Sequence, residues 1–465
     1  MVQQAAGLPT LTPATSTPLT SATLTPLTPL KSTIFIPKFR HSLAGCPALV
    51  PCDCLNQTID CGSRRLVLAP QFHQHDLPFD KLKLNNNHIT TVTNLTFRGL
   101  KVTEINLSFN RISTIDDDVF SGLETTLRVL NLEFNHLTSL PKTVFTLQNM
   151  EELDISHNRI LSADQVDGQF LLMKKFMASG NLLTQWPNWL NRLPFLEELD
   201  LGYNPISTFP DNLSDLQWTL HRVTLDNCQF HKIPQQLSQL HRLEFLDFSF
   251  NPIGDKGIWY DSFHGQSGSL KELLLQSVNI TAVPKALGSL SSLNKLDISD
   301  NNLGFIREDI LPGQLTEVIM KSCGLHRIPA TLSDLKNLKS LELANNHIQS
   351  IENHDLQGLS NLINLDLSSN NMQHVSPRAA VNLTRIQNFW LFDNKLTELP
   401  AVVQEFQTLK ELNLEANPLQ CTCRDGWPAV WITRHPSVQV KGYCENLGGL
   451  DALKFISNYN HYCAV

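Results

Sequence analysis

The stretch "LEELDLGYNPI", residues 196–206, decides the fold of this chain because its pattern returns throughout the sequence. The same spacing of leucines and of one asparagine appears in three further copies, "LNKLDISDNNL" (293–303), "LKSLELANNHI" (338–348) and "LINLDLSSNNM" (362–372). A pattern that returns at a regular period indicates a repeat architecture, in which one structural unit is stacked on the next.

The unit is a short strand with one buried face. In "ELDL" the apolar and polar residues alternate, so Leu199 and Leu201 point to one side while Glu198 and Asp200 point to the other. So short a strand cannot bury a core by itself, and its backbone groups are unpaired on both edges. Each copy therefore needs a neighbour on either side, and the strands are expected to form one continuous parallel sheet.

One position of the unit holds asparagine in most copies. A short amide side chain both donates and accepts hydrogen bonds, so it can satisfy the backbone groups of the turn that ends each strand. Cys228 and Cys323 are small, weakly hydrogen-bonding substitutes, whereas the side chain of Val278 forms no hydrogen bond. The fifteen positions are 22 to 27 residues apart, within the repeat period of about 20–29 residues known for such units; they are Asn87, Asn110, Asn135, Asn158, Asn181, Asn204, Cys228, Asn251, Val278, Asn301, Cys323, Asn346, Asn370, Asn394 and Asn417.

The longest interval, 27 residues, ends at Val278 and contains "GDKGIWYDSFHGQSGS" (254–269). We interpret this segment as a bulging loop and a weak junction of the array, with a protruding binding element as the alternative. The substitution Val278→Asn is then expected to raise stability by about 1 kcal/mol, the net contribution of one hydrogen bond.

The repeats resemble those of the extracellular leucine-rich repeat proteins of animals, which include Slit-, chaoptin-, small-proteoglycan- and Toll-ectodomain-type chains. The resemblance runs from Cys46 to Cys463, and the outer halves of the units mix two kinds, such as "FRGL" (97–100) and "IPQQL" (233–237). It implies an α/β repeat solenoid, a curved horseshoe with a parallel β-sheet on its concave face, about fifteen repeats and a disulfide cap at each end. The implied divisions are a disordered Thr/Pro-rich segment at 1–45, an N-terminal cap at 46–76, the repeats at 77–420 and a C-terminal cap at 421–463.

Two groups of four cysteines flank the repeats, where a solenoid must cover its exposed apolar ends. The C-x-C spacings do not match the usual C-x-x-C pairs of a zinc site, which is the alternative. Disulfides indicate an oxidising compartment, and the two cysteines within the repeats are expected to stay free. By resemblance to the caps of the family, the expected disulfides are Cys46–Cys54, Cys52–Cys61, Cys421–Cys444 and Cys423–Cys463.

N-glycosylation sequons agree with an extracellular location, and six are present: Asn56, Asn94, Asn106, Asn212, Asn279 and Asn382. The first thirty residues contain five prolines, eight threonines and no charge, a composition typical of a disordered, O-glycosylated stalk. No signal peptide is evident at Met1, so either secretion uses a start upstream of Met1 or Met1 is not the biological start. A cytosolic protein with reduced caps is the alternative.

Several functional classes are not expected. The sequence has no H-E-x-x-H, G-x-S-x-G, phosphate-binding or dinucleotide-binding motif, so we expect neither catalysis nor a cofactor. His73 and His75 could bind a metal, but we interpret them as surface residues and expect no metal site. The net charge of -8 argues against nucleic acid as a partner, and no apolar run approaches the roughly 18 residues of a membrane span.

The outward positions of the strands form the expected binding surface. Sixty such positions carry seventeen acidic and six basic residues, a difference of -11, which would attract a basic protein partner. The alternative is that aspartate at the central position is ordinary repeat composition. The position before the asparagine is aromatic in several units, which predicts an exposed row of rings, with packing on a neighbour's edge as the alternative. The expected site residues are Phe109, Phe134, His157, Glu198, Asp200, Tyr203, Asp247 and Phe250.

The first functional hypothesis is an extracellular recognition or adhesion protein that binds a protein ligand on its concave face. One alternative is the ectodomain of a Toll-like signalling receptor, which requires a membrane helix and a signalling domain after Cys463. A regulatory leucine-rich repeat subunit and a homodimer are further alternatives.

Overall fold

The computed structural model describes residues 51–72, 79–163, 170–304, 306, 310–424 and 426–463. Every described residue lies within Ser42–Val465, the second of the two units into which the chain divides. The predicted N-terminal segment, Cys46 and the pair His73 and His75 lie outside the described residues.

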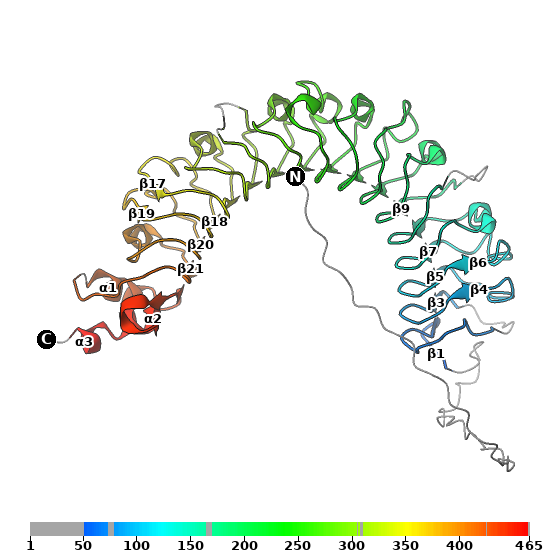
Figure 1. The fold of residues 1–465 in the computed structure, drawn as a ribbon, viewed down its shortest axis with the longest axis horizontal. Helices are drawn as coiled ribbons and strands as arrows, with labels where there is room; N and C mark the ends of the chain where they lie inside the picture. Colours follow the sequence, from blue (N-terminus) through cyan, green and yellow to red (C-terminus); the bar gives the residue numbers. More distant parts are fainter. Residues whose placement is uncertain are drawn as a thin grey trace, which may run out of the picture. The chain divides into compact units, whose positions relative to one another are not determined.

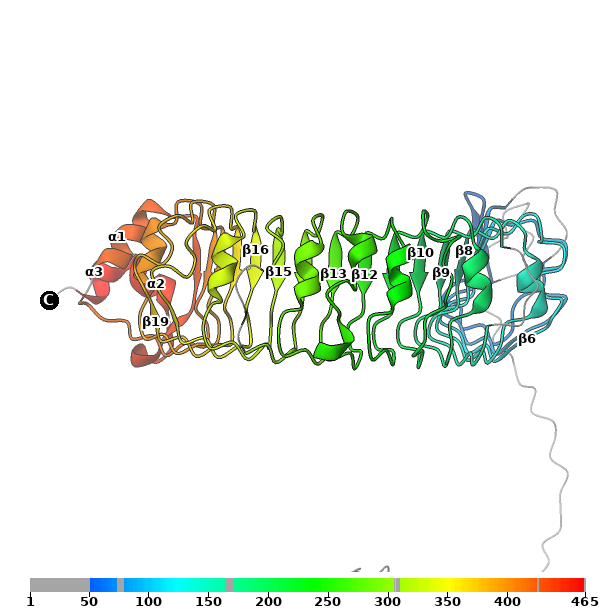
Figure 2. The same ribbon diagram turned by 90° about the horizontal axis from the view of Figure 1, so that it is seen from above.

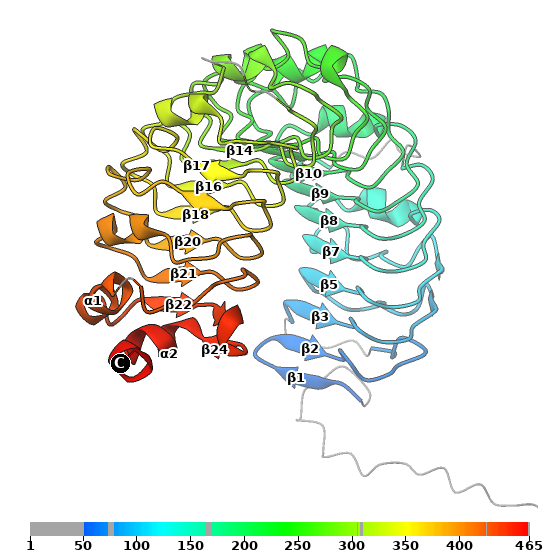
Figure 3. The ribbon, with the colours of Figure 1, turned by 60° about the vertical axis from the view of Figure 1, so that its left-hand side comes forward.

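Eighteen of the described strands form one curved sheet along the inner face of the repeats (Figure 1; Figure 3). Its first pair is antiparallel and the later pairs are parallel, which confirms the predicted repeat solenoid. In order across the sheet the strands are β1 (Asp53–Leu55), β2 (Thr58–Asp60), β3 (Lys81–Lys83), β5 (Glu104–Asn106), β7 (Val129–Asn131), β8 (Glu152–Asp154), β9 (Lys175–Met177), β10 (Glu198–Asp200), β11 (Arg222–Thr224), β12 (Phe245–Asp247), β13 (Glu272–Leu274), β14 (Lys295–Asp297), β15 (Glu317–Ile319), β16 (Ser340–Glu342), β18 (Asn364–Asp366), β20 (Asn388–Trp390), β21 (Glu411–Asn413) and β22 (Gln439–Lys441).

The central apolar residues of the strands form the core. Leu199 lies in register with Phe176 of the preceding strand and Val223 of the next, and all three are fully buried. Burying one such side chain contributes about 1.5–3 kcal/mol, so the columns of stacked apolar residues are a major source of stability. Because alternate residues face opposite sides, the same register places Glu198 and Asp200 on the concave surface.

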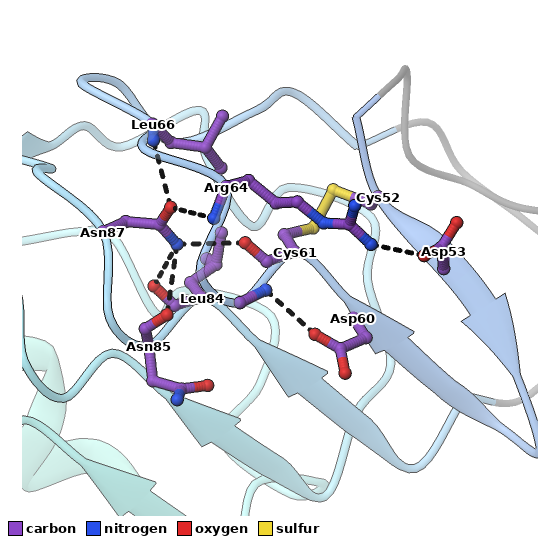
Figure 4. Close-up of a disulfide and its surroundings, with 10 residues drawn as sticks. Cys52, Asp53, Asp60, Cys61, Arg64, Leu66, Leu84, Asn85 and Asn87 are labelled. Carbon is purple, nitrogen blue, oxygen red and sulfur yellow. Dashed lines mark hydrogen bonds and ion pairs between the residues drawn. A yellow bond between two sulfur atoms is a disulfide. The ribbon is translucent and has the colours of Figure 1, made fainter. Parts of the chain in front are cut away.

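The asparagine of each unit joins neighbouring coils, where a coil is the turn of the solenoid that one repeat unit forms. At Asn87 the side-chain N–H donates to the carbonyls of Cys61 and Leu84 at 2.9 Å, and its oxygen accepts the backbone N–H of Arg64 and Leu66 at 2.9 and 3.0 Å (Figure 4). The same donors and acceptors recur in later coils. We call these buried hydrogen bonds between successive units the asparagine ladder. They satisfy the backbone groups of the turn, which is the role that the sequence predicted for asparagine at this position.

The ladder changes where the next coil lacks its asparagine. Before Val278, the N–H of Ile253 has no amide oxygen to donate to, and it donates instead to the carbonyl of Asn251 at 2.8 Å. Pro252 lies within this tight turn and has no N–H of its own to satisfy. The coil before Cys228 makes the same bond at Ile206, again beside a proline.

The two substituted cysteines keep part of the ladder. Cys228 Sγ donates to the carbonyl of Leu201 at 3.5 Å, and Cys323 Sγ donates to that of Ile298 at 3.4 Å. Both cysteines are free and buried. They therefore act as the weakly hydrogen-bonding substitutes that the sequence suggested.

The long segment 254–269 is packed against the preceding coil, which differs from the expected loose loop. It contains the short 3-10 helices η4 (Asp255–Gly257) and η5 (His264–Gln266). Phe263 is fully buried, and Gln266 Nε2 donates to the carbonyls of Leu237 and Leu240 at 2.6 and 2.9 Å. The extra residues thus add contacts at this junction, and the structure does not support a weak point there.

Short helices and narrow sheets cover the outer side of the curve (Figure 2). Each five-residue 3-10 helix follows a proline, whose fixed φ suits the start of a helical turn. These helices are η1 (Lys142–Thr146), η2 (Asn188–Arg192), η3 (Gln235–Gln239), η6 (Lys285–Ser289), η7 (Ala330–Asp334) and η8 (Ala401–Glu405). Other units carry two-stranded parallel sheets, β4 (Thr91–Val92) with β6 (Thr114–Ile115) and β17 (Ser350–Ile351) with β19 (His374–Val375).

Disulfides hold both caps, and they join Cys52 to Cys61, Cys421 to Cys444 and Cys423 to Cys463. These are pairs that the family resemblance implied. Cys54 is also disulfide-bonded, while its expected partner lies outside the described residues. The C-terminal cap consists of α1 (Trp427–Arg434), β23 (Tyr443–Cys444), η9 (Glu445–Leu447), β24 (Leu450–Asp451), α2 (Ala452–Ser457) and α3 (Tyr459–Tyr462).

Candidate functional site

The candidate binding surface is the concave sheet together with the turn that comes after each strand. At a strand spacing of about 4.8 Å, fourteen intervals give an inner surface roughly 70 Å long. Glu198 and Asp200 lie on β10 and Asp247 on β12, two strands further along. The structure therefore brings the expected acidic residues onto one part of the surface.

Ion pairs engage much of the concave charge. Glu198 lies between Lys175 and Arg222, with nitrogen to oxygen distances of 3.5 and 3.6 Å. The Arg222 guanidinium also lies 3.4 Å from the ring centre of Phe245. Five of the six concave bases form such pairs with concave acids, so the acidic excess remains after pairing. Glu198 is thus held by its neighbours on both sides.

Asp200 and Asp247 have a local structural role. Asp200 accepts the backbone N–H of Gly202 at 2.9 Å, and Asp247 accepts that of Ser249 at the same distance. Desolvation by partial burial raises the pKa of both carboxyl groups above the ordinary aspartate value. The same bond recurs at the central position of other coils, which favours the interpretation of this aspartate as repeat composition.

Asp226 follows β11, the strand between β10 and β12, and is an acidic residue that the expected site did not include. A Cβ atom placed on Gly202 would lie 2.1 Å from Asp226 Oδ1 and 3.3 Å from Asp200 Oδ1, so both carboxylates border the space above this glycine. Burial, together with repulsion from Asp247 and Asp200, raises the pKa of Asp226 to about 7. The absence of a side chain at Gly202 is the sequence signal that could have identified this arrangement.

The residue before each asparagine position is in the left-handed region of backbone conformation in all fifteen units. Glycine and asparagine tolerate this region, whereas a bulky side chain adopts it only with strain. Phe109, Phe134, Tyr203 and Phe250 nevertheless occupy it, with φ between 51° and 57°. Sequence reasoning found the ring positions but not this conformational cost.

The rings form two groups. Phe109, Phe134 and His157 stack, with centroid distances of 4.6 and 4.1 Å, and a Cβ on Gly180 would lie 2.6 Å from His157 Nδ1. These three side chains therefore pack on one another, as the alternative interpretation proposed.

Tyr203 and Phe250 are in the second group, 51% and 43% exposed. Among the described residues neither ring stacks on another aromatic ring. Asn227 occupies the same position in the strand between them, which separates the two rings by roughly 10 Å. Tyr203 also lines a shallow hollow of about 300 Å³ with Asn204, Pro205, Asn227, Cys228 and Gln229.

Two further features lie outside the expected site residues, the first on the segment that the sequence offered as an alternative binding element. Trp259 and Tyr260 are 58% and 79% exposed on segment 254–269. A larger hollow of about 430 Å³ lies between the last repeat and the C-terminal cap, bordered by Trp427, Phe455 and Tyr459. Sequence alone gave no sign of this hollow, because its walls come from three separate segments, around Leu399, Cys421 and Phe455.

The sequon residues Asn56, Asn94, Asn212, Asn279 and Asn382 are exposed, and Asn106 is half-buried on β5. Within the described ranges, no group of three or more His, Cys, Asp and Glu side chains is arranged to hold a metal ion. No helix in the described part of the chain is long and apolar enough to cross a membrane.

Family models described as leucine rich repeat match residues 80–125, 125–183, 195–216, 239–258, 314–372 and 336–396. The chain is 34% identical over 119 residues to Toll-like receptor 2 type-2 of Gallus gallus, and 38% identical over 92 residues to leucine-rich repeat-containing protein 3 of Danio rerio. These matches cover 25% and 19% of this chain, and only 15% and 33% of the two relatives.

Three solved structures share the fold. A leucine-rich repeat protein of Leptospira interrogans gives a TM-score of 0.66 at 22% identity, over 82% of this chain and 94% of that one. An Arabidopsis thaliana receptor kinase ectodomain, in complex with Casparian strip integrity factor 2, gives 0.57 at 21% identity over 87% and 52%. A chain of the Toll–Spatzle complex of Drosophila gives 0.59 at 17% identity over 79% and 54%.

Proposed function

On the premise that this chain belongs to the leucine-rich repeat proteins, we propose that it is an extracellular recognition protein that binds a protein ligand on its concave face and catalyses no reaction. The observation that carries the proposal is the pair Tyr203 and Phe250, whose rings are exposed and held in a strained conformation. Aromatic side chains dominate binding energy when a partner buries them, and a free monomer gains little from exposing them.

The size and charge of the surface support a macromolecular partner. A surface roughly 70 Å long exceeds what a metabolite can contact. Five of the six concave bases are already paired with acids, so the remaining acidic groups favour a basic protein and disfavour nucleic acid. Two of the related structures are of complexes, one with Casparian strip integrity factor 2 and one with Spatzle.

The extracellular location rests on the caps and the sequons. Disulfides persist in oxidising compartments, and the structure has them at both ends of the array. Five sequon asparagines are exposed, which is what attachment of a glycan requires. We therefore propose a glycoprotein that is secreted or displayed at the cell surface.

Within the proposed site, Tyr203 and Phe250 are the anchors that a ligand would bury. The stacked rings Phe109, Phe134 and His157 form a second, more rigid contact area near the N-terminal end of the repeats. Glu198, Asp200 and Asp247 supply negative potential, although ion pairs and backbone hydrogen bonds already hold them. A basic ligand would meet this potential without displacing them.

The test is capture of a ligand from extracellular fluid by the glycosylated chain, with affinity measurements on concave variants as the second step. The double substitution Tyr203→Ala with Phe250→Ala should raise Kd at least about 30-fold, equivalent to roughly 2 kcal/mol of lost contact. Phe134→Ala tests the second contact area. Tyr443→Ala is the matched control, because Tyr443 is 52% exposed in the C-terminal cap. Equal affinity for every concave variant would contradict the proposed function.

A receptor ectodomain is the second candidate, favoured by the match to Toll-like receptor 2 type-2 of Gallus gallus. The two candidates differ in the segment expected beyond the C-terminal cap of the native protein. Mass spectrometry of the protein from its native source should find a longer chain with a membrane segment for the receptor, and none for a secreted protein. A regulatory subunit would instead co-purify with an enzyme, and light scattering would detect a homodimer.

A further inference from the structure

The hollow beside Tyr203 lies where the repeat is interrupted. Cys228 replaces the asparagine of its coil, so the N–H of Ile206 donates to the Asn204 carbonyl at 2.7 Å rather than to a side chain of the next coil. Pro205 fixes the resulting turn. The space left between the two coils is the hollow of about 300 Å³, at the end of β10 and β11.

The walls of the hollow are suited to a peptide rather than to a reaction. Tyr203 and Pro205 supply apolar surface, and the side-chain amides of Asn227 and Gln229 border the opening. Cys228 is only 6% exposed, its Sγ donates to the Leu201 carbonyl, and burial raises the pKa of its thiol to about 12. The thiol is therefore a poor nucleophile, and the hollow offers shape and hydrogen bonds.

Acidic side chains border the same place, and a cation beside them would favour their ionised form. The carboxylates of Asp226 and Asp200 meet above Gly202, the residue next to Tyr203. Arg222, the basic side chain of the coil that carries Asp226, is occupied by Glu198 and by the ring of Phe245. A cation from a partner could thus approach these acidic groups while Arg222 stays engaged with Glu198 and Phe245.

We propose that this hollow is the anchor subsite for an extended segment of a basic protein ligand. One large apolar side chain of the segment packs between Tyr203 and Pro205, and a neighbouring Arg or Lys lies against Asp226. The amides of Asn227 and Gln229 bond the backbone of the segment, since an amide both donates and accepts. This subsite rests on the proposed function, because it specifies which part of a protein ligand the concave edge holds.

The test uses an array of synthetic hexapeptides that combine one Leu, Phe or Trp with one Arg or Lys at every spacing, alongside matched peptides with Glu in place of the base. Peptides that carry both features should bind the full glycosylated chain. Tyr203→Ala and Asp226→Asn should each weaken that binding at least ten-fold, and the Glu peptides should not bind. Phe392→Ala is the matched control, because Phe392 is a 41% exposed ring in the turn after β20 of the same sheet.

The subsite is refuted if no peptide distinguishes the wild-type chain from Tyr203→Ala, or if Phe392→Ala weakens binding equally. Circular dichroism of each variant shows whether a loss reflects unfolding, and Tyr203→Phe should retain most of the affinity since the ring is kept. A captured protein ligand that depends on Phe134 but not on Tyr203 or Asp226 would refute the subsite and leave the proposed function standing. Independence from every concave variant would refute both.

Discussion

The substitution Val278→Asn is expected to destabilise the chain, the opposite of what the repeat pattern predicts. The pattern predicts one added hydrogen bond. In the structure, the N–H that should donate to the new amide oxygen belongs to Ile253, and it is already bonded to the Asn251 carbonyl at 2.8 Å. The carbonyls of Phe248 and Leu275 could still accept the new side-chain N–H, because a ladder carbonyl such as that of Leu84 accepts from two asparagines, so the amide oxygen decides the outcome.

The magnitude is set by burial. Val278 is fully buried, so an amide oxygen placed there would have neither water nor a protein donor. An unsatisfied buried acceptor costs about 1–3 kcal/mol, and the loss of apolar contacts adds to it. We therefore expect a decrease of roughly 1–3 kcal/mol in the free energy of unfolding.

The assay is denaturant unfolding of the disulfide-intact chain, together with hydrogen exchange at the Ile253 amide to localise the effect. Because Pro252 fixes the turn, Pro252→Ala should restore part of the loss when it is combined with Val278→Asn, with a coupling of about 1 kcal/mol. Cys323→Asn is the comparison, since the N–H of Leu303 makes the same turn bond there, to the Asn301 carbonyl at 3.0 Å, although residue 302 is Asn rather than Pro. An increase in stability for Val278→Asn alone would refute the reasoning.

Three further predictions concern packing, charge and the caps. Gly265→Ala should lower the free energy of unfolding by more than about 2 kcal/mol, because its Cβ would lie 1.9 Å from the Ser238 carbonyl oxygen. Gly268→Ala should have little effect, because a Cβ there would have no atom within 4 Å. Equal melting temperatures of the two variants would contradict the packing of segment 254–269. Asp226→Asn should raise the free energy of unfolding by about 1 kcal/mol above pH 7, allowing for solvent screening, and should have no such effect below pH 4. The reason is that the pKa of Asp226 rises from 3.8 to about 7 on folding. The native wild-type chain therefore keeps this proton between the two values, and its stability falls as the pH rises through them. A gain that does not vary with pH would exclude this cause. Replacing Cys421 and Cys444 by Ala should cost about 2–5 kcal/mol in thermal unfolding, and peptide mapping without reductant should show Cys228 and Cys323 unlinked.

The fold could be predicted because one physical constraint acts on every unit. Leu199 and its counterparts must be buried in register, and a residue such as Asn301 must bond two coils at once, so both leave a periodic record in the sequence. The disulfide pairs were accessible only through the family resemblance, because spacing alone permits other connections. Fold prediction therefore rested on repetition, and the caps rested on similarity.

The candidate site was less predictable because its properties depend on contacts between coils. Asp200 looked like an exposed acid, but it accepts the Gly202 N–H, and Glu198 is shared by two bases. Phe109 and Tyr203 occupy the same position of their units, yet the first stacks on a neighbouring ring and the second lines a hollow. Only the identity of the adjacent coil distinguishes such cases, and a single unit does not contain that information.

Two interruptions of the asparagine ladder lie beside Tyr203 and Phe250, the rings of the proposed binding site. An Asn-Pro pair precedes both Cys228 and Val278 by one coil, at Asn204 and Asn251, whereas the same turn bond before Cys323 forms at Leu303 without a proline. At each of these two Asn-Pro pairs an exposed ring, Tyr203 or Phe250, stands beside the altered turn. A structural constraint alone would favour asparagine throughout, since it bonds both coils, and would disfavour bulky rings in a left-handed turn. We propose that the exposed rings Tyr203 and Phe250 serve binding, because the break before Cys323 has Asp300 at the same position and a break of the ladder therefore does not itself require a ring.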